Sequence, residues 1–139
     1  MDPEIDAKIR ASFDKQSLMT TLGARLVRVQ TGEVDIDAPI QQGSLQQQGF
    51  AHAGLTFAIG DSAAGYAALS LLPMDQEVLT TEMKINLLAP GAGERLIARG
   101  RVIKPGRRIM VVQSDVFAVK DGQERHIALL TGSMMPVPI

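Results

Sequence analysis

One long apolar segment constrains the fold of this chain more than any other feature. Residues 51–72 are rich in alanine, glycine and leucine, and they hold one charged side chain, Asp61. Asp61 is the only Asp, Glu, Lys or Arg between Asp37 and Asp75. The segment is long enough for a helix, and a helix without a polar face must be covered on most of its sides. Because the segments after it are strand-like, we expect a curved sheet wrapped around this helix.

The rest of the chain alternates strand patterns with turn signals. A short helical segment is expected over about residues 3–22, with Pro3 near its first turn. Strand patterns at 24–30 and 33–36 are joined by Thr31-Gly32, which suggests a hairpin. After the long helix, polar and apolar residues alternate and Asp121-Gly122 marks a second hairpin. Four antiparallel strands are therefore expected, at 80–88, 95–103, 109–119 and 126–135, the last ended by Pro136 and Pro138. The prediction is one α+β domain over residues 1–139.

Composition excludes several classes of function. The net charge is −1 and the pI about 6.1, so nothing attracts the chain to nucleic acid or to an anionic membrane. No cysteine is present, which excludes disulfides, thiolate metal sites and a cysteine nucleophile, and which fits a reducing compartment. Two histidines are too few for a histidine-rich zinc site. The polar N-terminus lacks a signal-peptide pattern, so we expect a cytoplasmic location and no membrane partner.

Asp61 is the strongest candidate for a functional residue. A carboxylate in apolar surroundings costs several kcal/mol unless partners satisfy it or its pKa rises. Proteins keep such groups mainly where chemistry uses them, although an ion pair or bonds to neighbouring hydroxyls would give the same pattern. His52 stands nine residues earlier, where the helix should begin.

Four blocks of sequence form a recognisable pattern. The first is His52-Ala53-Gly54, with Gln46 six residues before the histidine and Asp61 nine after it. The others are the strand Thr80-Thr-Glu-Met-Lys-Ile-Asn-Leu-Leu-Ala-Pro90, Gly106-Arg107 before a long strand, and a closing Thr-Gly-Ser. In this order they resemble the hotdog-fold acyl-CoA thioesterases, and among these the phenylacetyl-CoA thioesterase-like branch. The branch usually has glycine in place of Ala53.

The resemblance implies hydrolysis of an acyl-CoA to a carboxylic acid and free coenzyme A, without a metal or organic cofactor. Asp61 would act as nucleophile or as general base towards water, and the residues leave this choice open. Ala53 and Gly54 lie in the first helical turn, where free N–H groups could stabilise an oxyanion. We expect desolvation to raise the pKa of Asp61 and the helix dipole to lower it, with the carboxylate ionised at neutral pH.

Other residues of the pattern have two interpretations each. His52 could polarise the carbonyl or cap the helix, and Gln46 could hold the thioester or be a solvated loop residue. Thr80 matches a position where the family places a hydroxyl near the acid, whereas by itself a threonine at a strand start is nearly always structural. The basic turn with Lys104, Gly106, Arg107 and Arg108 could meet the phosphates of coenzyme A or be merely solvated. Phe57, Tyr66 and Leu69 could line an acyl pocket or only pack the core.

Two further functions and one assembly remain to be weighed. A hotdog hydratase or dehydratase usually pairs a histidine with a carboxylate in a different motif. A non-catalytic acyl-CoA-binding module has no reason to keep a lone charge beside its apolar pocket. The resemblance also implies a homodimer or a dimer of dimers, with Gln46 and Ala53 of one subunit meeting Asp61 and Thr80 of the other. Unpaired edge strands would favour the same association.

Overall fold

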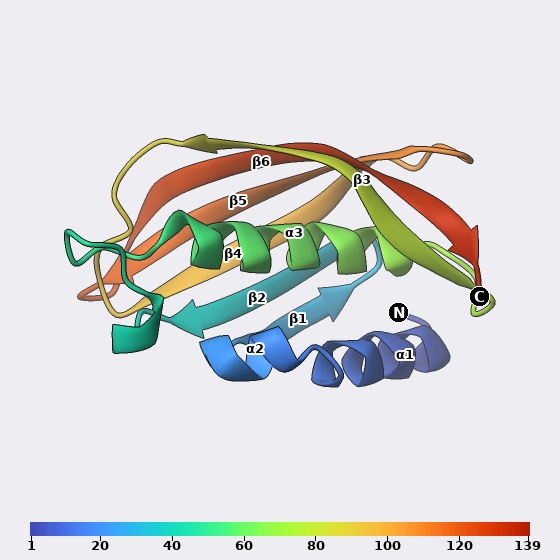
Figure 1. Ribbon diagram of the computed structural model, residues 1–139. Coiled ribbons are helices and arrows are strands. Elements are labelled where there is room, and N and C mark those ends of the chain that lie inside the picture. The colour runs from blue at the N-terminus through green and yellow to red at the C-terminus, as the bar shows by residue number, and fades with distance from the viewer.

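The computed structural model describes residues 1–139 and places one long helix against the concave side of a curved sheet (Figure 1). The helices are α1 (Pro3–Asp14), α2 (Ser17–Leu22) and α3 (Ala53–Leu69), with one 3-10 turn, η1 (Gln42–Ser44). The strands are β1 (Arg25–Gln30), β2 (Glu33–Pro39), β3 (Gln76–Leu87), β4 (Arg95–Lys104), β5 (Met110–Lys120) and β6 (Gln123–Pro138). The predicted α+β class and the hotdog arrangement of sheet around helix are both confirmed.

The six strands form one sheet in the order β1-β2-β4-β5-β6-β3, and every neighbouring pair is antiparallel. Both predicted hairpins are present. Gly32, with φ of 79°, turns the chain from β1 to β2, and Asp121 and Gly122, with φ of 50° and 75°, turn it from β5 to β6. Positive φ at both central residues, as at Asp121 and Gly122, is typical of a type I′ hairpin turn. In this strand order β3 is an edge strand, and its one neighbour is β6, the last strand of the chain.

Small residues let α3 lie very close to the sheet. Ala63 and Ala67 are fully buried. A Cβ on Gly100 of β4 would stand 2.4 Å from the carbonyl carbon of Ala63, so only glycine allows this approach. Around the contact, one cluster of 20 buried residues joins α3 to the N-terminal helices and most of the strands. This close packing explains why the helix has no polar face.

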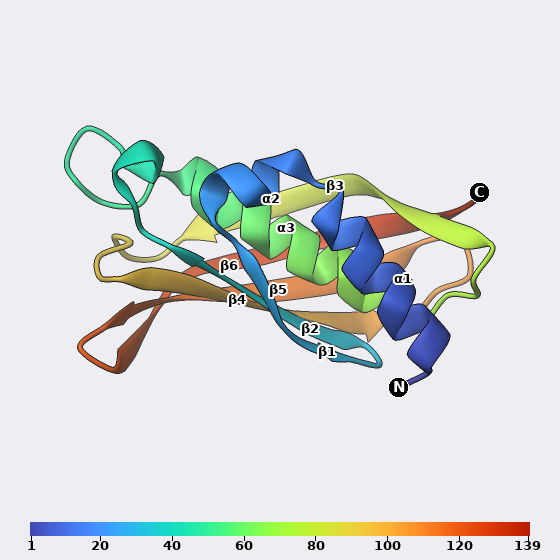
Figure 2. The same cartoon turned by 90° about the horizontal axis from the view of Figure 1, so that it is seen from below.

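The two N-terminal helices lie across α3 and tie it to the start of β3 (Figure 2). Ile9 and Phe13 of α1 are buried, as the spacing of apolar residues in this segment predicts. The ammonium group of Lys8 donates to the carbonyl of Met74 at 3.0 Å and to that of Gln76, and it lies 3.3 Å from the carboxylate of Glu77. The N-terminal segment thus forms a cover over one side of the central helix. None of the helices is both long and apolar enough to cross a membrane.

Several strands extend beyond their predicted boundaries, among them β2, which ends at Pro39, and β6, which begins at Gln123. β3 begins four residues before Thr80, and β6 continues through Pro136, which pairs with Val78. Beyond Met134 the strand β6 has only β3 as a partner, and a proline is tolerated where one side of a strand is open. The prediction that Pro136 ends the strand is therefore wrong.

A β-bulge interrupts β3 beside the central helix. The pairing with β6 shifts between Thr80 and Glu82, so Thr81 is the extra residue. A bulge reverses the alternation of side chains along a strand. As a result, Val78 before the bulge and Met83 and Ile85 after it all pack against the core. The same shift turns Thr80 towards α3.

Candidate active site

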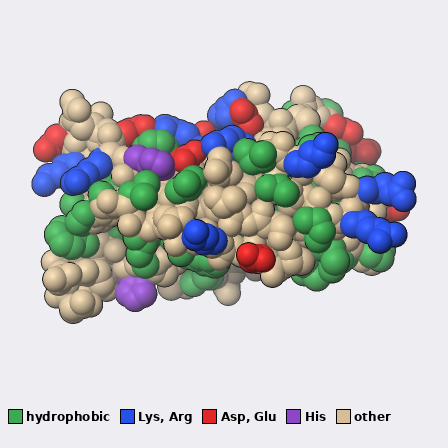
Figure 3. Space-filling view, turned by 90° about the horizontal axis from the view of Figure 1, so that it is seen from above, with side chains coloured by type: hydrophobic (Ala, Val, Ile, Leu, Met, Phe, Trp, Pro, Cys, Tyr) green, Lys and Arg blue, Asp and Glu red, His purple; other side chains and the backbone are tan.

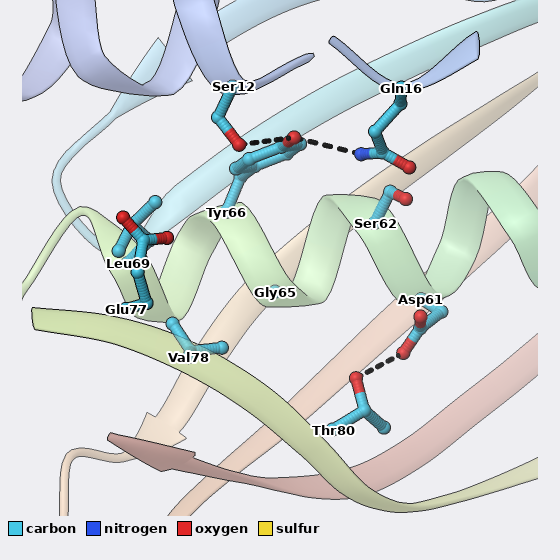
Figure 4. A pocket seen from close by; sticks show the side chains of 10 residues that line it. All are labelled: Ser12, Gln16, Asp61, Ser62, Gly65, Tyr66, Leu69, Glu77, Val78 and Thr80. Atoms are coloured by element: carbon cyan, nitrogen blue, oxygen red, sulfur yellow. Dashed lines mark hydrogen bonds between the residues drawn. The ribbon is translucent and has the colours of Figure 1, made fainter. Parts of the chain in front are cut away.

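Asp61 stands on α3 about two turns beyond the helix start, on the side that faces β3. Its Oδ1 accepts a hydrogen bond of 2.8 Å from Oγ1 of Thr80 (Figure 4). None of the ion pairs in the molecule includes Asp61. The structure thus places the hydroxyl of Thr80 beside the carboxylate of Asp61. The bulge at Thr81 makes this contact possible, because it turns the side chain of Thr80 towards α3. The alternative of a buried ion pair does not apply, whereas the expected alternative of a bond to a neighbouring hydroxyl is present.

The environment of Asp61 raises its pKa above the ordinary aspartate value. Burial is the main cause, and the hydrogen bond from Thr80 lowers the pKa by less. We expected the helix dipole to lower the pKa of Asp61 as well, and the structure corrects this. Asp61 lies well past the first turn of α3, and the effect of the dipole falls off within that turn. A carboxylate with a raised pKa is a stronger base than an exposed one.

Asp61 opens onto a pocket of about 240 Å³ between α1, α3 and the first half of β3. Tyr66 lines the side of the pocket towards α1, and its hydroxyl is bonded to Oγ of Ser12 at 3.0 Å and to Nε2 of Gln16 at 2.8 Å (Figure 4). Leu69 also lines this pocket, whereas Phe57 packs against the core. Sequence reasoning missed Ser12 and Gln16. No local signal marks them, because polar residues in a short amphipathic helix and just after it are expected to be solvated.

A second, larger groove of about 520 Å³ lies at the start of α3. Gln46, His52 and Ala53 line it together with the end of β3. Nδ1 of His52 accepts a hydrogen bond of 2.7 Å from the N–H of Gly54, so His52 is the N-cap of the helix. The N–H of Ala53 has no acceptor among the turn and cap hydrogen bonds. Of the two expected oxyanion donors, Ala53 is therefore free and Gly54 is engaged.

Gln46 is held within its own loop. Its Oε1 accepts from the N–H groups of Gln48 and Phe50, the latter at 3.2 Å, and its Nε2 donates to Oε1 of Gln48 at 3.1 Å. The side chain therefore shapes the loop that forms the rim of the groove. The alternative that Gln46 is only a solvated loop residue therefore does not apply, because its side chain is hydrogen-bonded within the loop.

The two parts of the expected site do not meet within one subunit. Ala53 and Asp61 lie on the same helix eight residues apart, which corresponds to about 12 Å along its axis. One group contains the acid with Thr80, and the other contains the free N–H with Gln46 and His52. Neither histidine contacts Asp61: His52 caps α3, and Nε2 of His126 lies 3.1 Å from Asp115.

The basic turn between β4 and β5 is far from the groove of the same subunit. Lys104, Arg107 and Arg108 are exposed there, at the end of the molecule opposite the start of α3 (Figure 1). Figure 3 shows several Lys and Arg side chains gathered at this end. A Cβ on Gly106 would stand 2.1 Å from the carbonyl oxygen of Ile109, so this glycine is required by the turn itself.

Comparison with known proteins places the chain in a family. The model of the Thioesterase superfamily matches residues 48–124, more than half of the chain. A thioesterase family protein from Silicibacter pomeroyi is 42% identical, with a TM-score of 0.95 over 97% of this chain and 99% of that one.

Two more distant structures share the fold. A Haemophilus influenzae thioesterase is 19% identical, with a TM-score of 0.83 over 91% of this chain and 87% of that one. The PaaI protein from the phenylacetic acid degradation operon of E. coli is 22% identical, with a TM-score of 0.84 over 96% and 93%. The match to the superfamily covers the start of α3, Asp61 and Thr80. The chain therefore belongs to the thioesterase superfamily and is a thioester hydrolase with the hotdog fold.

Proposed function

We propose that this protein hydrolyses an acyl-CoA thioester to a carboxylic acid and free coenzyme A, with Asp61 as the reacting carboxylate. The observation that carries the proposal is Asp61 itself. It is half-buried on the central helix, it has no cationic partner, and it lines a pocket with one hydroxyl to hold it. Structural carboxylates in such positions are normally paired with a cation, so its setting favours a chemical role.

The chemistry needs no metal or organic cofactor. As a general base, Asp61 would take a proton from the water that attacks the thioester carbonyl, and the thiolate of coenzyme A would leave and be protonated. As a nucleophile, it would form a mixed anhydride that water then hydrolyses. Both routes pass through an oxyanion, which the N–H of Ala53 at the helix N-terminus is suited to stabilise, with His52 and Gln46 at the rim.

The proposal includes a second copy of the chain, because one subunit holds the two halves of the site apart. The outer edge of β3 has no partner in the sheet, and Leu79 and Leu87 on this strand are 55% and 59% exposed. A two-fold pairing along β3 would cover the open edge and bring the copies together beside Thr80. Gln46 and Ala53 of one subunit would then face Asp61 and Thr80 of the partner subunit.

The same assembly gives the basic turn a role. Lys104, Arg107 and Arg108 carry three exposed positive charges, which suit the phosphates of coenzyme A. Gly106 would serve them indirectly, by making the tight turn that presents them. In one subunit the turn lies away from the groove at the start of α3, so the coenzyme would have to reach it across the interface.

Release of free coenzyme A from a panel of acyl-CoAs tests the proposal. Asp61→Asn keeps the shape of the side chain and removes the charge, so kcat should fall by about 10²-fold or more. Asp35→Asn is the matched control, because burial also raises the pKa of Asp35 but this residue lies on β2 and outside the pocket. It should hydrolyse at the wild-type rate.

Three outcomes would contradict the proposal. If folded Asp61→Asn kept the wild-type rate, the acid would not be the reacting group. If no acyl-CoA released coenzyme A but several bound, the chain would be a binding module. If the acyl group gained or lost water while the thioester stayed intact, the chain would be a hydratase or dehydratase.

A further inference from the structure

One buried hydroxyl near the start of α3 has no hydrogen-bond partner in the protein. We propose that this hydroxyl, of Thr56, donates a second hydrogen bond to the carbonyl oxygen of the substrate, beside the N–H of Ala53. The inference deepens the proposed function and rests on it, because it assumes that an acyl thioester binds at this helix start. It adds a catalytic residue to the oxyanion half of the site.

Thr56 differs from the other buried polar residues of the molecule. Five polar or charged residues are buried, and Thr56 is among them at 2% exposed. The hydroxyls of Ser70 and Ser114 each donate to a backbone carbonyl at 2.6 Å. The hydroxyl of Ser44 donates to another at 3.1 Å, and the carboxylate of Asp37 is paired with an arginine. Only Thr56 has no such bond, and an unpaired buried hydroxyl costs free energy, so its presence calls for an explanation.

The hydroxyl of Thr56 opens into the groove at the start of α3. Every fully enclosed side-chain nitrogen or oxygen in the molecule has a hydrogen-bond partner. Because the hydroxyl of Thr56 has none, it is not fully enclosed, and the small exposed area of the residue has to include it. Thr56 lines the groove together with Ala53. A molecule bound in the groove can therefore reach this hydroxyl.

The helix itself places Thr56 beside the free N–H of Ala53. Thr56 follows Ala53 by three residues, and residues three apart lie on the same face of a helix. Helical side chains also lean towards the N-terminus of their helix, so the side chain of Thr56 leans back towards the first turn. An oxygen atom bound at the N–H of Ala53 would thus lie next to the side chain of Thr56.

The backbone of this helix start has few donors left for an oxyanion. The N–H of Gly54 donates to Nδ1 of His52 at 2.7 Å, and the N–H of Leu55 donates to the carbonyl of His52 at 3.0 Å. The oxygen of a thioester becomes negatively charged during attack, and donors aimed at it stabilise the transition state more than the substrate. The hydroxyl of Thr56 would supply the donor that Gly54 does not.

Thr56→Val tests the inference, because it removes the hydroxyl and keeps the shape of the side chain. Release of coenzyme A from phenylacetyl-CoA and from acetyl-CoA should show kcat lowered by about tenfold, which is the loss of one ordinary hydrogen bond in the transition state. The loss should be similar for both substrates, because they share the thioester carbonyl, and KM should change little. The melting temperature should not fall, since no hydrogen bond within the protein is lost.

Two further variants serve as controls. Thr56→Ser keeps a hydroxyl at the same position and should restore most of kcat. Thr20→Val makes the same change in a helix, at an exposed residue of α2 that lines neither the groove nor the pocket at Asp61. It should leave kcat unchanged.

Each other outcome overturns the inference or the function beneath it. Wild-type kcat in Thr56→Val would mean that the hydroxyl contacts only water. A raised KM with unchanged kcat would make it a contact of the bound substrate and not of the oxyanion, and a lowered melting temperature would give it a structural role. In these cases loss of hydrolysis in Asp61→Asn would still support the proposed function. If the wild type hydrolyses no acyl-CoA at all, the proposed function fails and the inference fails with it.

Discussion

The start of α3 and the region around Asp61 differ in the chemical group that each provides. The groove at the helix start has a free backbone N–H at Ala53 and no carboxylate. The pocket at Asp61 has a carboxylate and no free N–H, because the backbone there is inside the helix. The two groups thus lie about two turns apart on one helix, and in the proposed function they are the two halves of one site.

The separation has a physical reason. The first turn of a helix stabilises negative charge, so a carboxylate placed there would have a lowered pKa and be a weaker base. The N–H groups of that turn would then donate hydrogen bonds to the carboxylate and would not be free to stabilise an oxyanion. Placing Asp61 further along the helix leaves burial as the main influence, and its pKa is raised. Under the proposed function, such a site would be complete only when two copies of the chain bring opposite half-sites together.

The largest expected effect is at the helix start. Ala53→Pro removes the N–H at the first helical position, where proline is tolerated. His52, with φ of −64° and ψ of 141°, already has the extended backbone that a following proline requires. We expect kcat to fall by about 10²- to 10³-fold, as for loss of other oxyanion donors.

Ala53→Ser is the control for this substitution, since it keeps the N–H. Steady-state kinetics and circular dichroism together separate loss of catalysis from loss of structure. Full activity of a folded Ala53→Pro protein would remove the helix start from the mechanism.

Mixing two inactive variants tests whether the half-sites come from different subunits. In a mixed dimer of Asp61→Asn and Ala53→Pro, one site receives an intact Asp61 and an intact Ala53, and the other receives neither. Random pairing after joint refolding makes about half of the dimers mixed, so activity should return to about a quarter of the wild-type value. Absence of recovery, with mixed dimers present, would mean that each site is built within one subunit.

A smaller effect is expected at the hydroxyl that holds Asp61. The carboxylate has to be ionised to act, so hydrolysis is lost as the pH falls through its pKa. Thr80→Val removes the hydrogen bond that lowers this pKa, so the acid limb of the pH–kcat/KM profile should move to higher pH. Thr81→Val is the control, because the hydroxyl of Thr81 is bonded to Ser133 and not to Asp61. An unchanged acid limb in Thr80→Val would assign that limb to another group.

The raised pKa also makes a prediction about stability. The folded state binds the Asp61 proton more tightly than the unfolded state does. The protonated Asp61 stabilises the folded state at low pH. This stability is lost as the pH rises from the pKa of Asp61 in the unfolded state to its pKa in the folded state, and above both values none of it remains. Asp61→Asn should unfold at a higher denaturant concentration than the wild type at neutral pH, and this gain should disappear in acid.

The smallest effect is expected at His52. Loss of its cap in His52→Ala should lower the free energy of unfolding by about 1 kcal/mol. His52→Asn restores a capping oxygen and should restore stability. If His52 acts only as a cap, His52→Asn should also restore kcat, which denaturation and kinetic measurements on the same samples would show.

Much of the fold follows from local patterns in the sequence. Thr31-Gly32 and Asp121-Gly122 determine the two hairpins, because few residues adopt positive φ without strain. The apolar segment with one acid identifies both the central helix and Asp61, because a helix with no polar face has to be enclosed. The sequence by itself thus determined the elements, their order and the residue most suited to chemistry.

Only the tertiary structure decided how the site residues meet. Alternation along β3, read back from Met83 and Ile85, would point Thr81 rather than Thr80 towards α3, and the bulge reverses this. Likewise, Ser12 and Gln16 reach Tyr66 across about 50 residues of chain. The physical reason is the same in both cases. A local pattern determines the period of an element, whereas the register between strands and the contacts between helices depend on packing that no short segment contains.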